Sequence, residues 1–358
     1  MPRFACLAGL LATGIVVATT DLSGQTGSNL DTLISRYIAV GRPAIQQAFP
    51  TEQAFRTSRG DIFQKTRDWR QQWTPTGSTF LLELSAWGLE QGWVDSVVVL
   101  RAAGDLVLRR SALVGTSAAQ DTYEVTFHRA AVALLISSRL FDEAERYLDL
   151  VRLRVVAAPV PGEPRLIDPS LVLTRALLAD ARTAPGFVST ASRGTGLDGR
   201  PNDALKDALE RADMAYLAAA RVPELAPEAN VRRAFVQHRL GRHNDALALL
   251  SKMAGDNPDT PVRYWRELFL GRTLEALSRP AEAALAYERA GALYPGAQTP
   301  GVALASLHQR QGEVDKAIRW AVEVRSAAAG RLDPWWQYWA GDLRRYPVWL
   351  AELRQARP

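Results

Sequence analysis

Hydrophobic residues recur three or four positions apart along almost the whole chain, which is the pattern of amphipathic helices. Prolines, glycines and polar residues separate these stretches, and the longest polar interruption, at about 184–202, predicts a loop. The stretch SVVVL at 96–100 is β-branched, but its continuation LRAAGDLVLRR keeps the helical spacing, so we expect a helix there as well. The pattern predicts an all-α protein of short helices joined by short turns.

Two of the expected helices, 264–277 and 280–293, have the lengths and breakers of a helical hairpin. Pro280 suits a first helical turn, where its missing N–H costs nothing. Glu282 then lies near the positive end of the helix dipole, which favours a carboxylate. The pair ends at Pro295, which cannot continue a helix.

Small residues stand where the two helices of this hairpin must touch. Gly271 on the first helix and Ala283 on the second allow a close approach of the two backbones, and Tyr287 fills the space around the contact. The alanine recurs at Ala246, Ala283 and Ala317, in steps of 37 and 34 residues. The turns RLGRHNDAL and RQGEVDKAI align with each other. This recurrence predicts a tandem array of similar hairpins rather than an irregular bundle.

The repeated unit resembles the tetratricopeptide repeat, whose 34 residues carry Leu-Gly, an aromatic, Ala, an aromatic and Pro in that order. The residues at the matching offsets here are Leu270, Gly271, Leu274, Ala283, Tyr287, Ala290 and Pro295. The chain departs from that pattern at Glu267, where the family has Trp, and at Leu274, where it has an aromatic residue. The resemblance implies a right-handed superhelix of antiparallel helix hairpins, each covering the apolar face of its neighbour.

The array divides the chain into four expected regions. They are a signal peptide at 1–18, a diverged helical region at 28–120, TPR-like helical repeats at 121–331, and an aromatic-rich segment at 333–358. Within the repeats, the units that match best are 227–260, 264–297 and 298–331.

The aromatic-rich segment allows two interpretations. It contains Trp335, Trp336, Tyr338, Trp339, Tyr346 and Trp349. An array of hairpins has an open end that must be covered, so we expect these rings to form a capping helix on the last unit. The alternative is a platform of indoles that stacks against a ligand.

The N-terminus has the pattern of an export signal, because Arg3 precedes an uncharged apolar run at 4–18 that is too short for a comfortable membrane span. Cleavage is expected after Ala18, and the alternatives are a buried helix or an uncleaved anchor. We therefore expect a periplasmic or extracellular protein with no transmembrane segment after signal removal. The single cysteine, Cys6, lies within the signal, so the mature chain would have neither disulfides nor thiolate ligands.

Charge and motif content argue against several classes of function. Lys and Arg number 43 against 38 Asp and Glu, and the basic residues are dispersed, so we expect no nucleic-acid partner. His238 and His243 are five apart and lack further metal-ligand residues nearby in sequence. GTGLDG at 194–199 matches a dinucleotide fingerprint but lacks its strand and helix. We expect a protein without catalytic residues, metal or cofactor.

With no catalytic or metal-binding motif expected, the remaining candidate site is a binding surface on the repeats. In the family that the repeats resemble, the first helix of each unit lines a concave groove. Carried over by position, the candidate groove residues are Phe235, His238, Trp265, Arg272, Glu275 and Gln309.

Aromatic residues and arginine dominate binding hot spots, so this groove predicts a non-enzymatic scaffold or adaptor for an unidentified protein or peptide partner. One alternative is a small-ligand or glycan-binding protein that uses the C-terminal aromatics. A third is an enzyme whose residues lie within 28–120. The sequence does not specify the oligomeric state.

Overall fold

The computed structural model describes the protein over residues 27–71, 74–93, 95–113, 118–157, 169–184, 203–253, 259–326 and 333–356. These residues form seventeen α-helices and contain no strand, so the predicted all-α class is confirmed. The chain divides into two compact units, 1–62 and 63–358, with the division inside the third helix. The signal peptide at 1–18, Cys6 and the 194–199 glycine motif lie outside the described residues.

The first unit is built on α1 (Gly27–Val40), α2 (Arg42–Ala48) and the first half of α3 (Glu52–Gln71). Its buried side chains include Tyr37 of α1 and Ile45 of α2. Phe49 and Phe55 meet edge to face, with ring centroids 6.1 Å apart. This small aromatic and aliphatic core holds α1 and α2 together.

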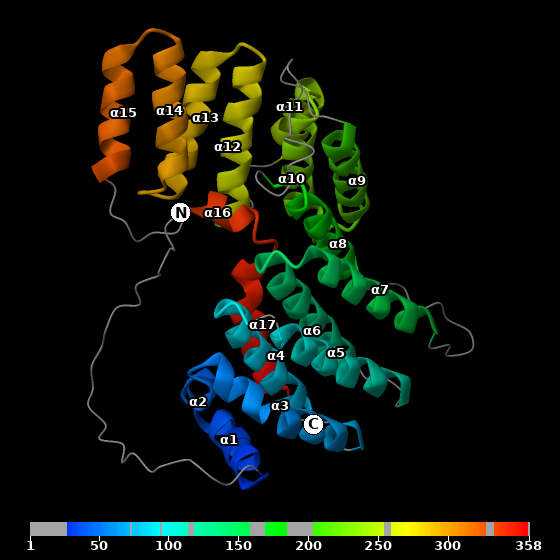
Figure 1. Cartoon of the computed structure of the whole chain (residues 1–358). Coiled ribbons are helices and arrows are strands. Elements are labelled where there is room, and N and C mark those ends of the chain that lie inside the picture. Colours follow the sequence, from blue (N-terminus) through cyan, green and yellow to red (C-terminus); the bar gives the residue numbers. More distant parts are fainter. Residues whose placement is uncertain are drawn as a thin grey trace. The chain divides into compact units, whose positions relative to one another are not determined.

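The second unit begins with the second half of α3 and continues with six helices, coloured from cyan to green in Figure 1. They are α4 (Pro75–Glu90), α5 (Ser96–Leu113), α6 (Ala118–Ser137), α7 (Phe141–Ala157), α8 (Pro169–Ala181) and α9 (Asp203–Ala219). Each of the pairs α4–α5, α6–α7 and α8–α9 packs together. The β-branched run at 96–100 lies in α5, as its spacing predicted.

Six further helices follow in three consecutive pairs, also labelled in Figure 1. They are α10 (Ala226–Arg239), α11 (His243–Lys252), α12 (Thr260–Ala276), α13 (Pro280–Leu293), α14 (Gln298–Arg310) and α15 (Val314–Ser326). The partners pack as α10–α11, α12–α13 and α14–α15, and α13 packs on α14. The expected helix at 280–293 is confirmed, whereas the one expected to start at 264 begins four residues earlier, with Pro261 in its first turn.

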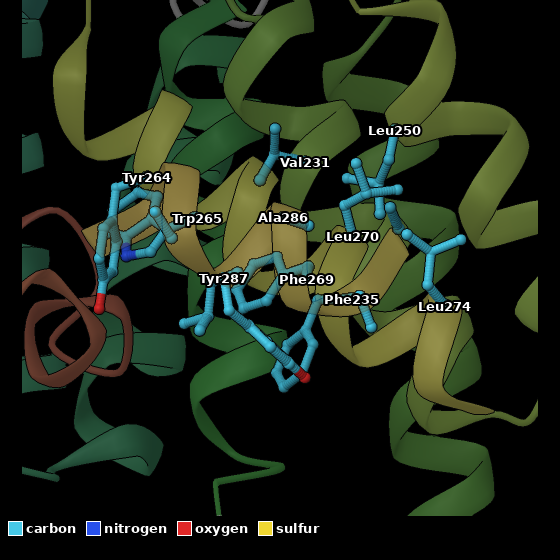
Figure 2. Packing of buried hydrophobic residues seen from close by; sticks show 14 of the residues in the cluster. Val231, Phe235, Leu250, Tyr264, Trp265, Phe269, Leu270, Leu274, Ala286 and Tyr287 are labelled. Atoms are coloured by element: carbon cyan, nitrogen blue, oxygen red, sulfur yellow. The ribbon is translucent and has the colours of Figure 1, made fainter. Parts of the chain in front are cut away.

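One hydrophobic core runs through α10 to α14, and Figure 2 shows part of it. Tyr287 from α13 is among its largest buried side chains. A Cβ atom on Gly271 would lie 2.5 Å from a ring carbon of Tyr287, which is closer than any real contact. Glycine is therefore needed at this position to leave room for the tyrosine ring. The sequence had suggested only that it allows the two helix backbones to approach.

The C-terminal segment differs from the single capping helix that was expected on the last hairpin. It is broken into α16 (Pro334–Tyr338), a 3₁₀ turn η2 (Leu343–Arg345) and α17 (Tyr346–Gln355). In sequence it follows α15, but α16 packs on α12, while η2 and α17 pack on α6 and α17 also on α4. Its aromatic residues therefore cover faces of earlier helices.

Among the helices of the described residues, none has both the length and the apolar character that a bilayer crossing requires.

Candidate functional site

Aromatic side chains from α16 lie against the faces of α10 and α12 that the repeat resemblance assigned to a groove. Phe235 contacts Trp335, Tyr338 and Trp339 edge to face, with ring centroids 5.5–6.1 Å apart. Trp265 is completely buried, and its Nε1 donates a hydrogen bond to the oxygen of Pro334 at 2.9 Å. The two predicted groove residues that are most hydrophobic are therefore covered by the chain itself.

A buried arginine fastens this segment to α10. The guanidinium of Arg232 lies over the rings of Trp265 and Tyr338, 4.6 and 4.5 Å from their centroids. Its Nη1 donates a hydrogen bond to the main-chain oxygen of Tyr338 at 3.1 Å, and its Nε donates one to the carboxylate of Glu228 at 2.9 Å. A cation over the faces of two rings is stabilised by both, and more strongly when water is excluded.

Glu228 also forms ion pairs with two arginines of η2. Arg344 and Arg345 donate to its carboxylate at 2.7 and 3.1 Å. Burial opposes ionisation of Glu228, but attraction to Arg232, Arg344 and Arg345 outweighs it and lowers the pKa of this carboxyl to about 2. The segment after α16 is thus held by a buried ionic cluster rather than by a surface contact.

A third attachment joins α16 to α8 and α9. Asp180, which is buried, accepts hydrogen bonds from Tyr338 at 2.5 Å and from Tyr216 at 3.0 Å. Burial, and then the charge of Asp180, raise the pKa of Tyr338 well above its usual value. This hydroxyl therefore keeps its proton at neutral pH and donates it to the hydrogen bond with Asp180.

Beside the aromatic segment there is an open pocket of about 720 Å³, within the range of small-ligand sites. Its walls come from α10, α12, α13, α14 and α16. They include His238, Arg272, Glu275, Tyr287, Gln298, Thr299, Val302, Ser306, Arg310, Trp335 and Trp336. Side chains from three successive hairpins and from the C-terminal segment therefore meet around one cavity.

The carboxylate of this pocket is already neutralised. Glu275 forms an ion pair with Arg310 across to α14, and it accepts a hydrogen bond from the hydroxyl of Tyr287 at 2.6 Å. Burial, followed by that bond, raises the pKa of Tyr287 beyond its usual range. Glu275 is therefore a structural link between two hairpins as well as part of the wall.

Arg272 is differently placed. Its guanidinium lies over the ring of Trp335, 4.7 Å from the centroid, and 5.9 Å from the ring centre of Phe235. Among the described residues no carboxylate lies within ion-pair distance of it. The two rings hold the cation while its N–H donors remain available to the pocket.

His238 closes the pocket on the α10 side. Its ring centroid lies 5.0 Å from that of His243, and its Nδ1 is 3.5 Å from the hydroxyl of Thr273. Burial, then the charges of His243, Arg272 and Arg239, lower the pKa of His238 to about 4. His238 is therefore uncharged at neutral pH. Within the described ranges, no three His, Cys, Asp or Glu side chains converge as a metal site would require.

The six predicted groove residues thus fall into three groups. His238, Arg272 and Glu275 line the pocket. Phe235 and Trp265 are buried beneath the C-terminal segment. Gln309 is exposed on α14 and is not part of the pocket lining.

Sequence reasoning missed the part that the C-terminal segment takes in this wall. Trp335 and Trp336 were expected either to cap the array or to form a platform, and the structure gives them separate environments. Trp335 packs on Phe269 and Arg272, whereas Trp336 lines the pocket with 66% of its surface exposed. The density of aromatic residues in this segment was a signal of extensive packing, but it did not indicate against which helices.

The arrangement can hold a ligand between charged and aromatic groups, with one guanidinium available. Scans of the chain against models of known protein families and against curated protein sequences found no match.

Proposed function

We propose that this chain is a non-enzymatic binding protein of tetratricopeptide-like architecture, and that its recognition site is the pocket between α12, α14 and α16. Three observations support the architecture: the consecutive helix pairs from α10 to α15, the recurring alanines, and the Gly271–Tyr287 contact. On this proposal the pairs form a right-handed superhelix, and the pocket lies on its concave side.

The observation that carries the proposal is the convergence of three successive hairpins on one open cavity. His238, Arg272 and Ser306 belong to the first helices of three neighbouring pairs, and all three line the pocket. A pocket assembled in this way has the size and the mixed lining of a recognition site. The partner is a protein that inserts a short segment, because the C-terminal segment already covers the rest of the expected groove.

A second candidate function is the binding of a small ligand or glycan. It is favoured by the exposed indole of Trp336, which together with Trp335 gives one wall of the cavity an aromatic face. This candidate shares the pocket with the first and differs only in the occupant.

Site-specific photo-cross-linking tests the first candidate. A photoreactive amino acid at Val302, which is 55% exposed in the pocket lining, is expected to capture a partner protein from the exported fraction. The matched control is Val314, which is 58% exposed on α15 and is not among the pocket residues. Capture of the same protein from both positions would contradict recognition at the pocket.

Export itself follows from the N-terminal pattern and is part of the proposal. Mass spectrometry of the protein recovered from the periplasm or medium is expected to find a mature chain that starts after Ala18. Recovery of the full-length chain in the cytoplasm alone would remove this part of the proposal.

A further inference from the structure

The chemistry of the pocket specifies a class of ligand, an inference that rests on the second candidate function, the binding of a small ligand or glycan. Its lining includes two arginines and one glutamate. Glu275 and Arg310 neutralise each other, and His238 is uncharged at neutral pH because its pKa is lowered to about 4. The positive charge that remains is that of Arg272.

Arg272 is prepared to receive an anion. Contact with the rings of Trp335 and Phe235 limits the freedom of its side chain, so less conformational entropy is lost when its donors are used. The guanidinium lies over the ring of Trp335 and beside that of Phe235, and its N–H groups lie in the plane of the cation. A planar carboxylate matches these donors with two parallel hydrogen bonds.

The apolar part of the lining favours a second feature in the ligand, an uncharged ring. Trp336 and Val302 are both more than half exposed at this cavity, and Ala303 lies beside them. An indole face gains from contact with another ring, and covering it removes apolar surface from water. A volume of about 720 Å³ accommodates a ring together with its anionic group.

We propose that the pocket binds a carboxylate carried on a ring, with the carboxylate on Arg272 and the ring against Trp336. Two sources share this chemistry, namely a sugar acid and an aromatic acid. Arg310 keeps its pairing with Glu275 and supports the wall, whereas Arg272 supplies the ionic contact.

Calorimetric titration of the full chain with four compounds tests this. Glucuronate and benzoate are expected to bind, while their neutral counterparts glucose and benzamide bind at least ten times more weakly. The tighter of the two acids identifies the source. Arg272→Gln is expected to weaken the acids at least tenfold and to leave the neutral compounds unchanged, and Trp336→Ala is expected to weaken all compounds that bind.

The matched control for the arginine is Arg279→Gln. Arg279 is exposed, pairs with Glu282 at 2.6 Å and is not part of the lining, so this variant is expected to bind like the wild type. Circular dichroism of each variant shows whether the fold is retained. A variant that fails to fold is replaced by Arg272→Lys, which keeps the charge but not the planar donor pair, and which should show a smaller loss.

The possible failures are distinguishable. Equal binding of acids and neutral compounds would overturn the carboxylate inference but leave a ring-binding pocket. Absence of binding by all four at millimolar concentration would overturn it as well, and capture of a partner at Val302 would then preserve the proposed function. If neither binding nor capture is found, the inference and the proposed function both fail.

Discussion

The indole nitrogen of Trp265 on α12 donates a hydrogen bond to the main-chain oxygen of Pro334, 69 residues later in the chain and 2.9 Å away. This contact places the start of the C-terminal segment on the faces of α10 and α12. A residue that sequence reasoning assigned to partner binding is instead part of the core.

The first prediction compares two tryptophans of opposite exposure. Trp265→Ala is expected to lower the free energy of unfolding by about 3–5 kcal/mol, because it opens a cavity and removes the support of Pro334. Trp336→Ala is expected to change it by less than about 0.5 kcal/mol, since that side chain is 66% exposed. Urea denaturation followed by circular dichroism measures both. Similar losses in the two variants would contradict the placement of the segment.

The second prediction concerns Gly271. Gly271→Ala is expected to destabilise the protein by about 1–3 kcal/mol, because the new methyl group would lie 2.5 Å from the ring of Tyr287. Gly291→Ala on α13 is the matched control, since its Cβ would meet Pro300 at an ordinary 3.9 Å, and helix propensity then favours alanine. Thermal melting distinguishes them. Adding Tyr287→Leu to Gly271→Ala should cost less than the sum of the two separate changes, and full additivity would argue against the contact.

The third prediction concerns Glu228 and acid. Because the pKa of this carboxyl is lowered to about 2, the unfolded chain binds the proton more readily, and stability is lost as the pH falls from about 4.5 towards 2. Glu228→Gln is expected to cost about 3–5 kcal/mol at neutral pH, since it leaves the buried Arg232 without its carboxylate and removes one partner of Arg344. The variant should also lose less stability than the wild type as the pH falls from about 4.5 to 2, because it lacks the carboxyl that takes up a proton there.

The readout is the difference between the unfolding free energies of wild type and Glu228→Gln at each pH. Groups outside the cluster contribute to both proteins and largely cancel. Asp342 does not cancel, because its pKa is raised by burial and by the charge of Glu228, so it titrates at lower pH in the variant and adds to the pH dependence of the difference. A difference that does not change between pH 5 and pH 2 would count against the ionic cluster.

The fourth prediction concerns His238 in mildly acidic solution. Its pKa of about 4 lies below the usual 6.5, so the unfolded state takes up the proton first and stability decreases as the pH falls from about 6.5 to 4. His238→Gln should flatten this part of the curve while leaving the slope below pH 4 intact. Chemical denaturation at half-unit steps of pH provides the test, and an identical slope in both proteins would show that His238 is accessible to water.

The helices were predictable from the sequence because their signals are local. The spacing of hydrophobic residues, Pro280 at a helix start and the turn glycines Gly241 and Gly312, which adopt positive φ, all act within a few residues. The pocket was only partly predictable. The repeat pattern placed Arg272 and Glu275 on an inward face. The spacing of residues, however, does not indicate that a distant segment folds back onto that face.

The placement of Trp265 and Phe235 could not be predicted for the same reason. Both are aromatic residues at positions that face inward, and an inward face is either open to a partner or covered by the chain. The deciding contacts join Arg232 to Tyr338 and Glu228 to Arg344, more than 100 residues apart. Such pairs leave no regular spacing in the sequence.

The attachment of η2 to Glu228 has a consequence for the order in which the molecule is made. The ribosome has to synthesise the chain through Pro334 before Trp265 can reach its hydrogen-bond acceptor, and through Arg345 before Glu228 gains its two later arginines, so this part of the core is completed only when synthesis is nearly finished. A chaperone that recognises exposed aromatic and basic residues would therefore release this protein late, and a product shortened before Pro334 would resemble an unfinished chain rather than a smaller folded one.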